Sequence, residues 1–516
     1  METGTVVSLT GGNGAIGSKI LLHLLESDKN LKVRVLLFHQ EKLKKATALA
    51  LKKNKDRIEL IRGTTSDISV CKRLVSDASY LIHTSGLIPP KSEHDPKGAY
   101  ESNFIGTKNL VDAIKNSPDK DKIKFIYISS VAVYGNRTEK HLWARVGDPV
   151  ISSDYDEYSY TKILAERYVL EAGLKYFVVL RQTAVAHSYL FKNNLSDGLI
   201  YQACLNAPYE WVTDNDTAVL FTHLVEYDLE GRLDGFFNRI YNIGGGKENR
   251  ITGYESMNKG FSLMGRDLKA FMDPNFFSTR NFHGAFFYDG DVLENYLHYQ
   301  NETIDYFWKE MGKKYWYFHL GRLVPPSFLR KHLFLKLCDY DDAPLYWVKH
   351  KEDYKVKAFY GSYDKFEQIP KSWSDYNLLC ENKDSQGNFI DFEKFKDPQY
   401  AKEHGQLLDH GFDDTKKLDE ITLEDVKKAV NYRGGLCLSE TMVKGDLFTK
   451  LTFQCHKGHT FKASPYTILY GGHFCPNCFE KPWKNGRIAK FSKFHAQLYY
   501  ADHDKEEEDD IYPPKN

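Results

Sequence analysis

The stretch Thr10-Gly11-Gly12-Asn13-Gly14-Ala15-Ile16-Gly17 decides the fold, because it follows an apolar strand and opens an amphipathic helix. The strand is predicted over residues 6–9, and apolar residues recur at helical spacing up to Leu24. Glycines at 11, 14 and 17 allow a tight turn, close approach of the backbone to a pyrophosphate, and close packing of helix on strand. The first N–H groups of the helix can bind the anion. The stretch therefore predicts a dinucleotide-binding loop formed by Gly11, Asn13, Gly14, Ala15, Ile16 and Gly17.

Apolar runs alternate with amphipathic segments from this loop to about Leu180, which is typical of βαβ units in a parallel sheet. Six strands are predicted, at residues 6–9, 33–37, 58–61, 80–83, 125–128 and 177–180. We expect an α/β fold with a doubly wound Rossmann sheet over 1–185 and a smaller mixed substrate lobe over 186–330. An aromatic and charged connecting region follows over 331–430, then a cysteine-containing module over 431–485 and a tail over 486–516.

Composition narrows the class of protein. At 516 residues the chain exceeds the usual size of one core, and 42% hydrophobic with 27% charged residues is ordinary globular composition. The 70 basic and 70 acidic side chains cancel, so no overall field draws the molecule to nucleic acid or an anionic membrane, although a local patch remains open. The N-terminus lacks a secretory pattern and no run of about 20 apolar residues occurs, so we expect a cytoplasmic protein without a transmembrane segment.

A catalytic set is predicted after the fifth strand. Ser130 ends that strand, and Tyr158 and Lys162 lie one helical turn apart, on the same face of the next helix. A phenol has an ordinary pKa of about 10, and a neighbouring ammonium favours its phenolate. Ser130 would then bind the substrate oxygen while Tyr158 passes a proton and hydride moves to or from a nicotinamide. Ser129 and Tyr160 are the alternatives at neighbouring positions.

These motifs resemble the extended short-chain dehydrogenase/reductase family over about residues 4–265. Further similar positions are His83-Thr84-Ser85-Gly86, Asn103-Phe104-Ile105-Gly106-Thr107, Leu180-Arg181 and Tyr241-Asn242-Ile243-Gly244. The resemblance implies that Ser85 and Gly86 lie along the cofactor, that Asn103 supports the active site, and that Lys162 also contacts the nicotinamide ribose. It implies NAD or NADP as cofactor and a small-molecule substrate.

The sequence departs from the family at positions that bear on specificity. Phe38-His39-Gln40-Glu41 has no acidic residue at the usual ribose position, and Arg34 lies in mid-strand, so NAD and NADP both stay open. Gly63-Thr64 replaces the family's Gly-Asp, which makes Asp67 a substitute near the adenine. Arg181-Gln182-Thr183-Ala184 differs from the Arg-Pro turn of members that act on nucleotide-sugars.

Cysteine spacing near the C-terminus predicts a metal. The four predicted ligands are Cys455, His459, Cys475 and Cys478, where a Cys-x-x-Cys pair joins a Cys/His pair in a tetrahedral zinc site. Cys437 competes with His459, and His473 is a weaker alternative. The segment resembles small zinc-ribbon modules, and four protein ligands imply a structural zinc. We expect the module to serve docking or oligomer contact, and the protein to form a homo-oligomer.

Two stretches have unusual composition. Aromatic residues gather between Phe271 and Tyr376, which predicts either a packed core or an apolar substrate wall, and the acidic run 502–510 is expected to be solvated.

The leading hypothesis is an NAD(P)-dependent oxidoreductase that interconverts an alcohol and a ketone, on a lipophilic, hydroxysteroid-like substrate. The alternatives are a nucleotide-sugar epimerase or dehydratase that uses bound NAD, and a zinc-ribbon protein that binds nucleic acid, although neutral net charge disfavours nucleic acid as a partner.

Overall fold

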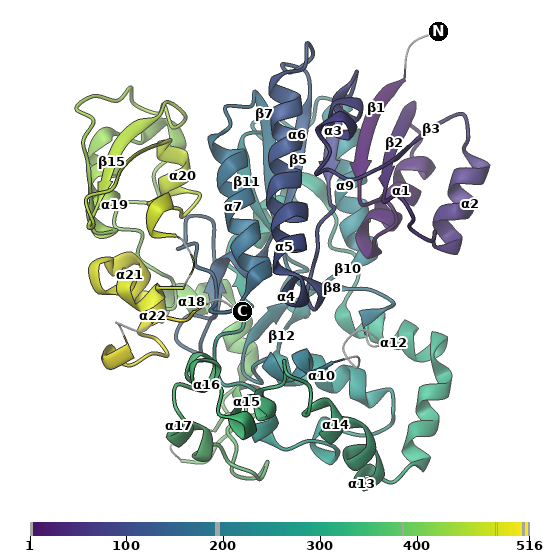
Figure 1. Cartoon of the computed structure of the whole chain (residues 1–516), viewed down its shortest axis with the longest axis vertical. Coiled ribbons are helices and arrows are strands. Elements are labelled where there is room, and N and C mark those ends of the chain that lie inside the picture. The colour runs from purple at the N-terminus through teal and green to yellow at the C-terminus, as the bar shows by residue number, and fades with distance from the viewer. Residues whose placement is uncertain are drawn as a thin grey trace.

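A seven-stranded parallel sheet organises the molecule in the computed structural model, which describes residues 4–190, 197–383, 386–479, 481, 483–507 and 511–513 (Figure 1). The strand order is β11-β7-β5-β4-β1-β2-β3, and every neighbouring pair is parallel. The strands are β1 (Thr5–Thr10), β2 (Leu31–Leu37), β3 (Ile58–Arg62), β4 (Tyr80–His83), β5 (Lys124–Ser130), β7 (Tyr176–Gln182) and β11 (Arg239–Ile243). The predicted doubly wound Rossmann fold is confirmed.

The strand order reverses between β1 and β4, so their carboxyl ends flank a crevice at the topological switch point, where ligands bind in such sheets. The seventh strand, β11, was not counted among the six predicted from the sequence. It follows β7 only after a long excursion through the mixed lobe, which hid its membership of the sheet.

Both faces of the sheet are covered by helices. On one face, α1 (Ala15–Glu26), α9 (Asp214–Leu229) and α11 (Gly290–Leu297) contribute to one buried cluster. On the other face, α3 (Ile68–Val75), α6 (Gly106–Lys115) and α7 (Glu157–Glu171) contribute to a second. Because the strands are buried on both sides, they read as continuous apolar runs rather than as alternating patterns.

The mixed lobe lies at the carboxyl ends of the strands. It pairs β8 (Val185–Ala186) with β10 (Val212–Thr213), and β9 (Pro208–Glu210) with β12 (Arg250–Thr252), ahead of α10 (Gly253–Ser262). The aromatic segment is largely the packed core that one interpretation predicted, since Phe271, Phe276, Phe277 and Phe334 share one buried cluster. The stretch 315–318 differs, because Trp316 is 64% exposed.

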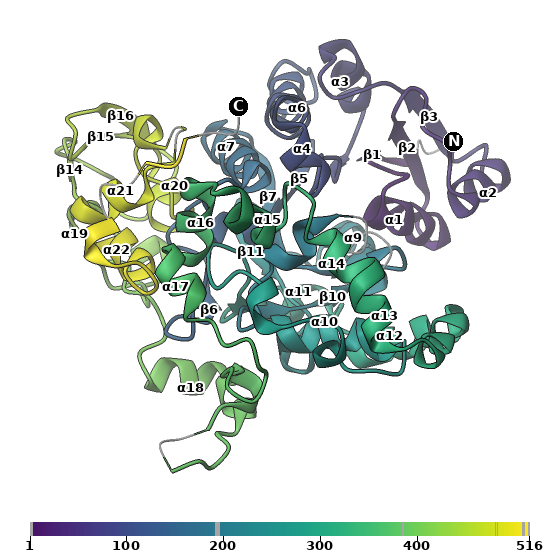
Figure 2. The same ribbon diagram turned by 60° about the horizontal axis from the view of Figure 1, so that its bottom comes forward.

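The C-terminal module packs against the sheet domain (Figure 2). It comprises α19 (Leu423–Tyr432), the antiparallel strands β14 (Gly435–Cys437), β15 (Leu451–Cys455) and β16 (Thr460–Ala463), and the helices α20 (Pro465–Leu469), α21 (Asn485–Phe491) and α22 (Lys493–Tyr499). The apolar residues of α19, β15, β16 and α20 belong to the same buried cluster as those of α6 and α7. The Tyr466 hydroxyl accepts a hydrogen bond of 2.9 Å from the Ile240 N–H on the edge strand β11.

The acidic run near the C-terminus is not simply solvated, which corrects the prediction. Glu507 is 6% exposed and forms an ion pair with Arg280, with 2.5 Å between guanidinium nitrogen and carboxylate oxygen. Lys365 also pairs with Asp504 at 2.6 Å. Buried Arg280 requires a counter-charge, and the run supplies it. Residues 508–510 lie outside the described residues. Among the helices that the structure describes, none is long and apolar enough to cross a membrane.

Candidate active site

The glycine loop has the geometry of an anion cradle. Gly11 has a φ of 71°, and a Cβ there would approach Thr84 Oγ1 to 2.9 Å. A Cβ on Gly17 would lie 2.1 Å from the Gly11 carbonyl oxygen, so helix α1 can pack this closely only without a side chain. The N-cap residue of α1 is Gly14, so no side chain accepts a hydrogen bond from the first turn of the helix. Its first-turn N–H groups, at Ala15 and Ile16, therefore stay available for a pyrophosphate.

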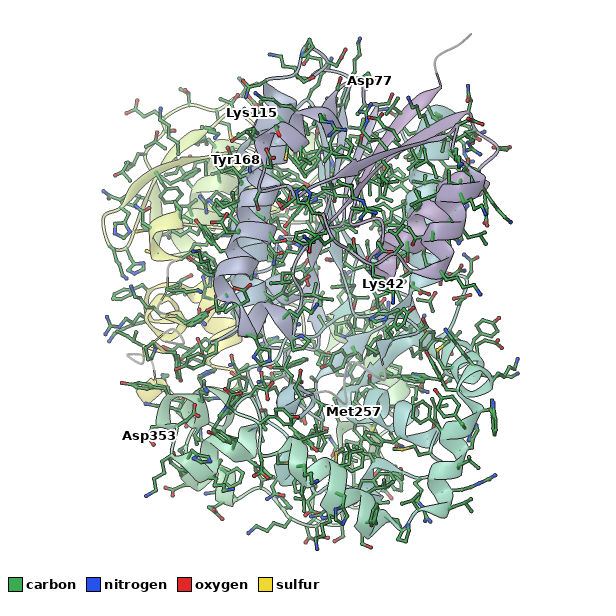
Figure 3. All side chains as sticks on the ribbon, turned by 45° about the vertical axis from the view of Figure 1, so that its right-hand side comes forward. Lys42, Asp77, Lys115, Tyr168, Met257 and Asp353 are labelled. Atoms are coloured by element: carbon green, nitrogen blue, oxygen red, sulfur yellow. The ribbon has the colours of Figure 1, made fainter. Side chains whose placement is uncertain are left out.

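Other residues predicted to touch the cofactor have structural partners. The Asn13 amide donates to the Lys42 carbonyl at 3.2 Å and accepts from the Lys44 N–H at 2.9 Å, which fixes the bend after β2 to the glycine loop. Figure 3 shows Lys42 above Met257, which belongs to the lobe. Exposed Asp67 caps α3 by accepting from the Ser69 N–H at 2.8 Å. Arg34 is committed to Glu59 and Asp77, at 2.8 Å each.

A buried network joins the ends of β1 and β4. The His83 ring nitrogens lie 2.8 Å from Thr10 Oγ1 and 2.9 Å from Thr107 Oγ1. Burial lowers the pKa of His83 to about 3, so the ring is neutral. Thr10 Oγ1 in turn accepts from the N–H groups of Thr84 and Ser85, at 3.1 Å each. Ser85 is thereby held beside Gly11, and Thr10, which was not among the predicted site residues, connects the two strand ends.

Ser130, Tyr158 and Lys162 come together at the carboxyl end of β5. The side chains of Ser130 and Tyr158 form a hydrogen bond. Lys162 Nζ lies 6.0 Å from the centre of the Tyr158 ring and donates to the Ile128 carbonyl at 2.6 Å. Of the alternatives, Ser129 instead donates to Glu166 at 2.6 Å. The structure thus brings together the three residues predicted first.

The electrostatics of Tyr158 differ from the prediction. Burial raises its pKa to about 12, and the hydrogen bond with Ser130 opposes that shift. The ammonium of Lys162 is directed to the Ile128 carbonyl rather than to the phenol, whose ring centre lies 6.0 Å away. Burial lowers the pKa of Lys162 to about 8, against the opposing charge of Glu166. Tyr158 is therefore a protonated hydroxyl at neutral pH, ready to donate.

Two polar residues position the start of α7. Asn103, in the π-helix η1 (Tyr100–Ile105), donates to Thr161 Oγ1 at 3.0 Å and accepts from the Leu87 N–H at 2.6 Å. A Cβ on Gly86 would lie 3.0 Å from the Asn103 amide oxygen, so these two predicted residues lie in contact. The carboxylate of Glu93 accepts from the Glu157 N–H at 3.1 Å and the Tyr158 N–H at 3.2 Å. Glu93, which sequence reasoning missed, thus caps α7.

A buried charge network links α7 to the C-terminal module. Glu166 lies one turn after Lys162 and pairs with Arg181, with 2.6 Å between carboxylate oxygen and guanidinium nitrogen. His473 Nε2 lies 3.1 Å from the same carboxylate, and Arg181 also donates to the Gly471 carbonyl at 2.7 Å. Positive groups hold the pKa of Glu166 well below its usual range despite its burial. His473, considered as a weak metal ligand, is thus occupied by Glu166.

A cavity of about 320 Å³ opens against Ser130. Apolar and aromatic side chains form much of its wall, including Tyr209, Trp211 and Phe282. Its charged lining is one-sided. The carboxylates are Glu93, Asp154, Asp156 and Asp197, whereas the described part of the chain contributes neither lysine nor arginine to the lining. His283 Nδ1 lies 2.8 Å from Asp156, which also caps α7 through the Ser159 N–H.

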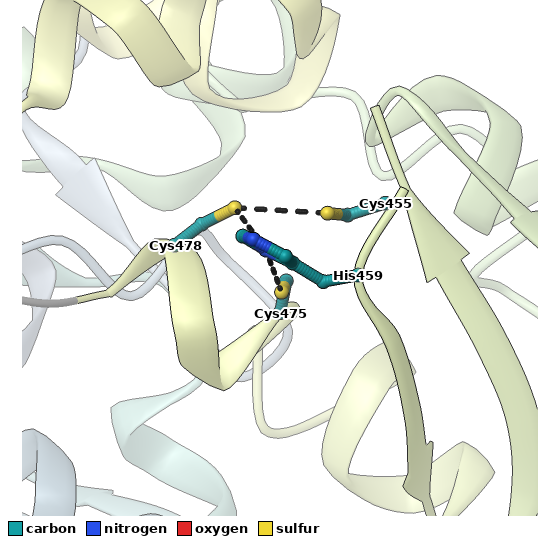
Figure 4. A group of neighbouring side chains, drawn as sticks. All are labelled: Cys455, His459, Cys475 and Cys478. Atoms are coloured by element: carbon teal, nitrogen blue, oxygen red, sulfur yellow. Dashed lines mark hydrogen bonds between the residues drawn. The ribbon is translucent and has the colours of Figure 1, made fainter. Parts of the chain in front are cut away.

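The four predicted metal ligands meet in the module (Figure 4). The sulfur atoms of Cys455 and Cys478 are 3.7 Å apart, and His459 Nδ1 lies 3.6 Å from Cys475 Sγ and 3.5 Å from Cys478 Sγ. A tetrahedral ion with Zn–S bonds of about 2.3 Å requires sulfurs about 3.8 Å apart. The geometry fits that donor set and excludes a disulfide, whose S–S bond is about 2.05 Å. Cys437, the rival to His459, is directed to the Ser439 carbonyl instead.

The sheet topology, the glycine cradle and the Ser-Tyr-Lys set define an extended short-chain dehydrogenase/reductase domain. Residues 7–244, just under half of the chain, match the model of the NAD dependent epimerase/dehydratase family.

Known relatives resemble this part of the chain. It is 29% identical over 171 residues to the 3 beta-hydroxysteroid dehydrogenase type 7 of Mus musculus, covering 33% of this chain and 44% of that protein. It is 31% identical over 172 residues to UDP-glucose 4-epimerase 3 of Oryza sativa subsp. japonica, covering 32% and 44%. The chain thus spans less than half the length of these curated relatives. A dTDP-glucose 4,6-dehydratase from Streptomyces venezuelae, with NAD and TYD bound, is 19% identical with a TM-score of 0.48, covering 61% and 98%.

Proposed function

We propose that this protein is an NAD(P)-dependent oxidoreductase that interconverts an alcohol and a ketone on an uncharged, largely apolar substrate. The observation that carries the proposal is the cavity against Ser130, whose described charged lining consists of carboxylates. A nucleotide-sugar presents a diphosphate, and proteins recognise such groups with arginine, lysine or helix N-termini. The ionised carboxylates of this lining would repel it, whereas a neutral lipophilic alcohol meets mostly apolar wall with a few polar groups.

The glycine loop fits a dinucleotide, since the cradle at Gly11 and Gly17 admits no side chain and α1 begins without a side-chain cap. When bound, the nicotinamide accepts or donates the hydride. The choice between NAD and NADP stays open. Glu41 accepts a hydrogen bond from the Phe38 N–H at 3.3 Å, and exposed His39 lies at the same bend.

The proposed proton path uses residues already in contact. The Ser130 hydroxyl hydrogen-bonds the Tyr158 phenol, so a carbonyl oxygen that replaces this contact would receive hydrogen bonds from both hydroxyls. Because burial keeps Tyr158 protonated, the phenol donates its proton to the oxygen as hydride reaches the carbon. Lys162, held at the Ile128 carbonyl, places a positive charge behind the phenol as its negative charge develops.

A substrate screen tests this proposal. The purified protein is incubated with lipophilic ketones and alcohols, including hydroxysteroids, and in parallel with UDP- and dTDP-sugars, with both cofactors. The nicotinamide absorbance is followed. Tyr158→Phe should abolish turnover while keeping cofactor binding, and Tyr160→Phe, two residues along the same helix, should stay active. Conversion of a nucleotide-sugar without net change in cofactor absorbance would refute the oxidoreductase and favour the epimerase alternative.

We further propose that Cys455, His459, Cys475 and Cys478 bind one structural zinc ion. Hydrogen bonding from Cys478 lowers the pKa of Cys475 to about 5, which favours the thiolate that binds metal. Four protein ligands leave no coordination position for substrate. The proposed role of the ion is to fix the segment 471–478, through which His473 reaches Glu166 on the catalytic helix.

A further inference from the structure

The segment 313–336, called here the edge segment, exposes large apolar side chains. It runs from the end of α12 (Ile304–Lys314) through η7 (Trp316–Leu323), α13 (Pro326–Leu329) and the π-helix η8 (Arg330–Phe334). Neither η7 nor α13 contains a buried residue. Leu323 is 76% exposed, Phe328 54% and Leu320 52%. Scattered exposed apolar residues are ordinary, but a run of them along one segment marks an interaction surface.

The same segment carries a one-sided charge. Its basic residues are Lys313, Lys314, Arg322, Arg330, Lys331 and Lys336, and the sequence has no acidic residue from 311 to 338. The whole chain is neutral, so this positive charge is concentrated here. Lys313 forms an ion pair with Glu310, just before the segment, and Arg330 forms one with Asp273 of the lobe. For the other four, the described residues supply no ion pair.

The edge segment is accessible from outside. The helices α12 and α13 both lie in the lobe on the side away from the C-terminal module (Figures 1 and 2). On its inner side the segment is anchored to the lobe, since Tyr315 donates to the Ser188 carbonyl at 2.8 Å and the Arg322 carbonyl accepts from Arg266 at 3.2 Å. Phe334 and Leu337, which follow, are buried in the lobe's aromatic cluster. The exposed side chains therefore stand on a rigid support.

We propose that the edge segment binds the surface of an anionic lipid bilayer, with its apolar side chains inserted at the headgroup boundary and its lysines and arginine on the lipid phosphates. Helical segments that combine exposed Trp, Phe and Leu with lysine and arginine bind in the interface plane. Each basic residue near an anionic surface adds to the attraction, and a tryptophan such as Trp316 prefers the interface. An acidic protein partner would pair with the basic side chains. Its charge would not account for the row of exposed apolar side chains, whereas an anionic bilayer accounts for both. The occupant is thus the bilayer, and the proposal stands apart from the catalytic one.

Vesicle co-sedimentation of the full chain tests the proposal. Wild-type protein should bind vesicles of phosphatidylcholine with phosphatidylserine, bind pure phosphatidylcholine far less, and dissociate at high salt. The variant Leu320→Ser, Leu323→Ser, Phe328→Ser should bind at least about tenfold more weakly. The matched control changes equally exposed residues of the module, Leu436→Ser, Leu438→Ser and Val443→Ser, and should bind like wild type.

A charge variant separates the two contributions. Lys314→Gln, Lys331→Gln and Lys336→Gln together should weaken binding on the order of a hundredfold and remove most of the salt dependence. All of these side chains are exposed, so thermal melting should be unchanged, and it is measured for each variant. Failure of the wild type to bind phosphatidylserine vesicles at low salt overturns the proposal. So does equal binding by wild type and the serine variant, or a dimer in light scattering that the serine variant dissociates while vesicles stay unbound.

Discussion

Replacing Glu166 with glutamine should destabilise the sheet domain by about 3–5 kcal/mol, the cost of breaking a buried ion pair by removing one partner. Glu166 and Arg181 are both fully buried, and the carboxylate also receives hydrogen bonds from Ser129 and lies beside His473. Glutamine keeps one acceptor oxygen but turns an amide donor toward groups that donate. It leaves the guanidinium charge of Arg181 uncompensated in the core.

Urea denaturation at pH 7.5, followed by circular dichroism, measures the change in the free energy of unfolding. Glu310→Gln is the matched control, because Glu310 forms an exposed pair with Lys313 three residues away, and this change should leave the free energy of unfolding close to the wild-type value. If Glu166→Gln were no more destabilising than Glu310→Gln, the buried network would not hold the domain together. Limited proteolysis of the same variant should also show earlier cleavage in the module, since Glu166 is one of its attachment points.

Three further outcomes are expected. Plasma emission spectrometry should find about one zinc per chain, lost in Cys475→Ser with Cys478→Ser, and chelation should lower the melting temperature; zinc retention by that variant would refute the assigned ligands. Burial raises the pKa of Asp154 to about 7, so the folded state binds the extra proton between pH about 4 and 7 and stability falls as pH rises through that window. Asp154→Asn should therefore gain about 2–3 kcal/mol of stability relative to wild type on going from pH 5 to pH 8 in urea denaturation, and a pH-independent difference would contradict the buried acid. Gly17→Ala should weaken NAD(P) binding in titration calorimetry by tenfold or more, since its Cβ meets a backbone oxygen at 2.1 Å, whereas Gly173→Ala, with no atom within 4 Å, should cost only about 1–2 kcal/mol of stability from its positive φ and leave binding intact.

The sequence predicted those parts of the site that depend on local spacing. The glycine loop, the Tyr158–Lys162 pair and the Cys475–Cys478 knuckle each lie within a few residues, so helix and turn geometry places their atoms. Contacts between distant segments carry no such signal. Glu93 caps the helix of Tyr158 from 65 residues away, and His473 reaches Glu166 across 307.

The pKa of Tyr158 could not be predicted for a similar reason. The spacing of Tyr158 and Lys162 was read correctly, but the pKa depends on how deeply the phenol is buried and where the ammonium points. Both follow from the packing of α7 against β5, which the pattern does not reveal. Likewise Tyr241–Gly244 was recognised as similar to the family, while the place of β11 beside β7 emerged only from the tertiary fold.

The hydroxyl that Tyr466 offers to the N–H of Ile240 has a consequence for handling this protein. Unpaired edge strands recruit strands from other molecules, and here the module shields the outermost one. A chain that ends at residue 244, with the family domain, would expose this edge strand and promote aggregation between copies. The C-terminal portion therefore protects the edge strand β11 from pairing with other copies. We expect the family domain to be insoluble when it is produced by itself.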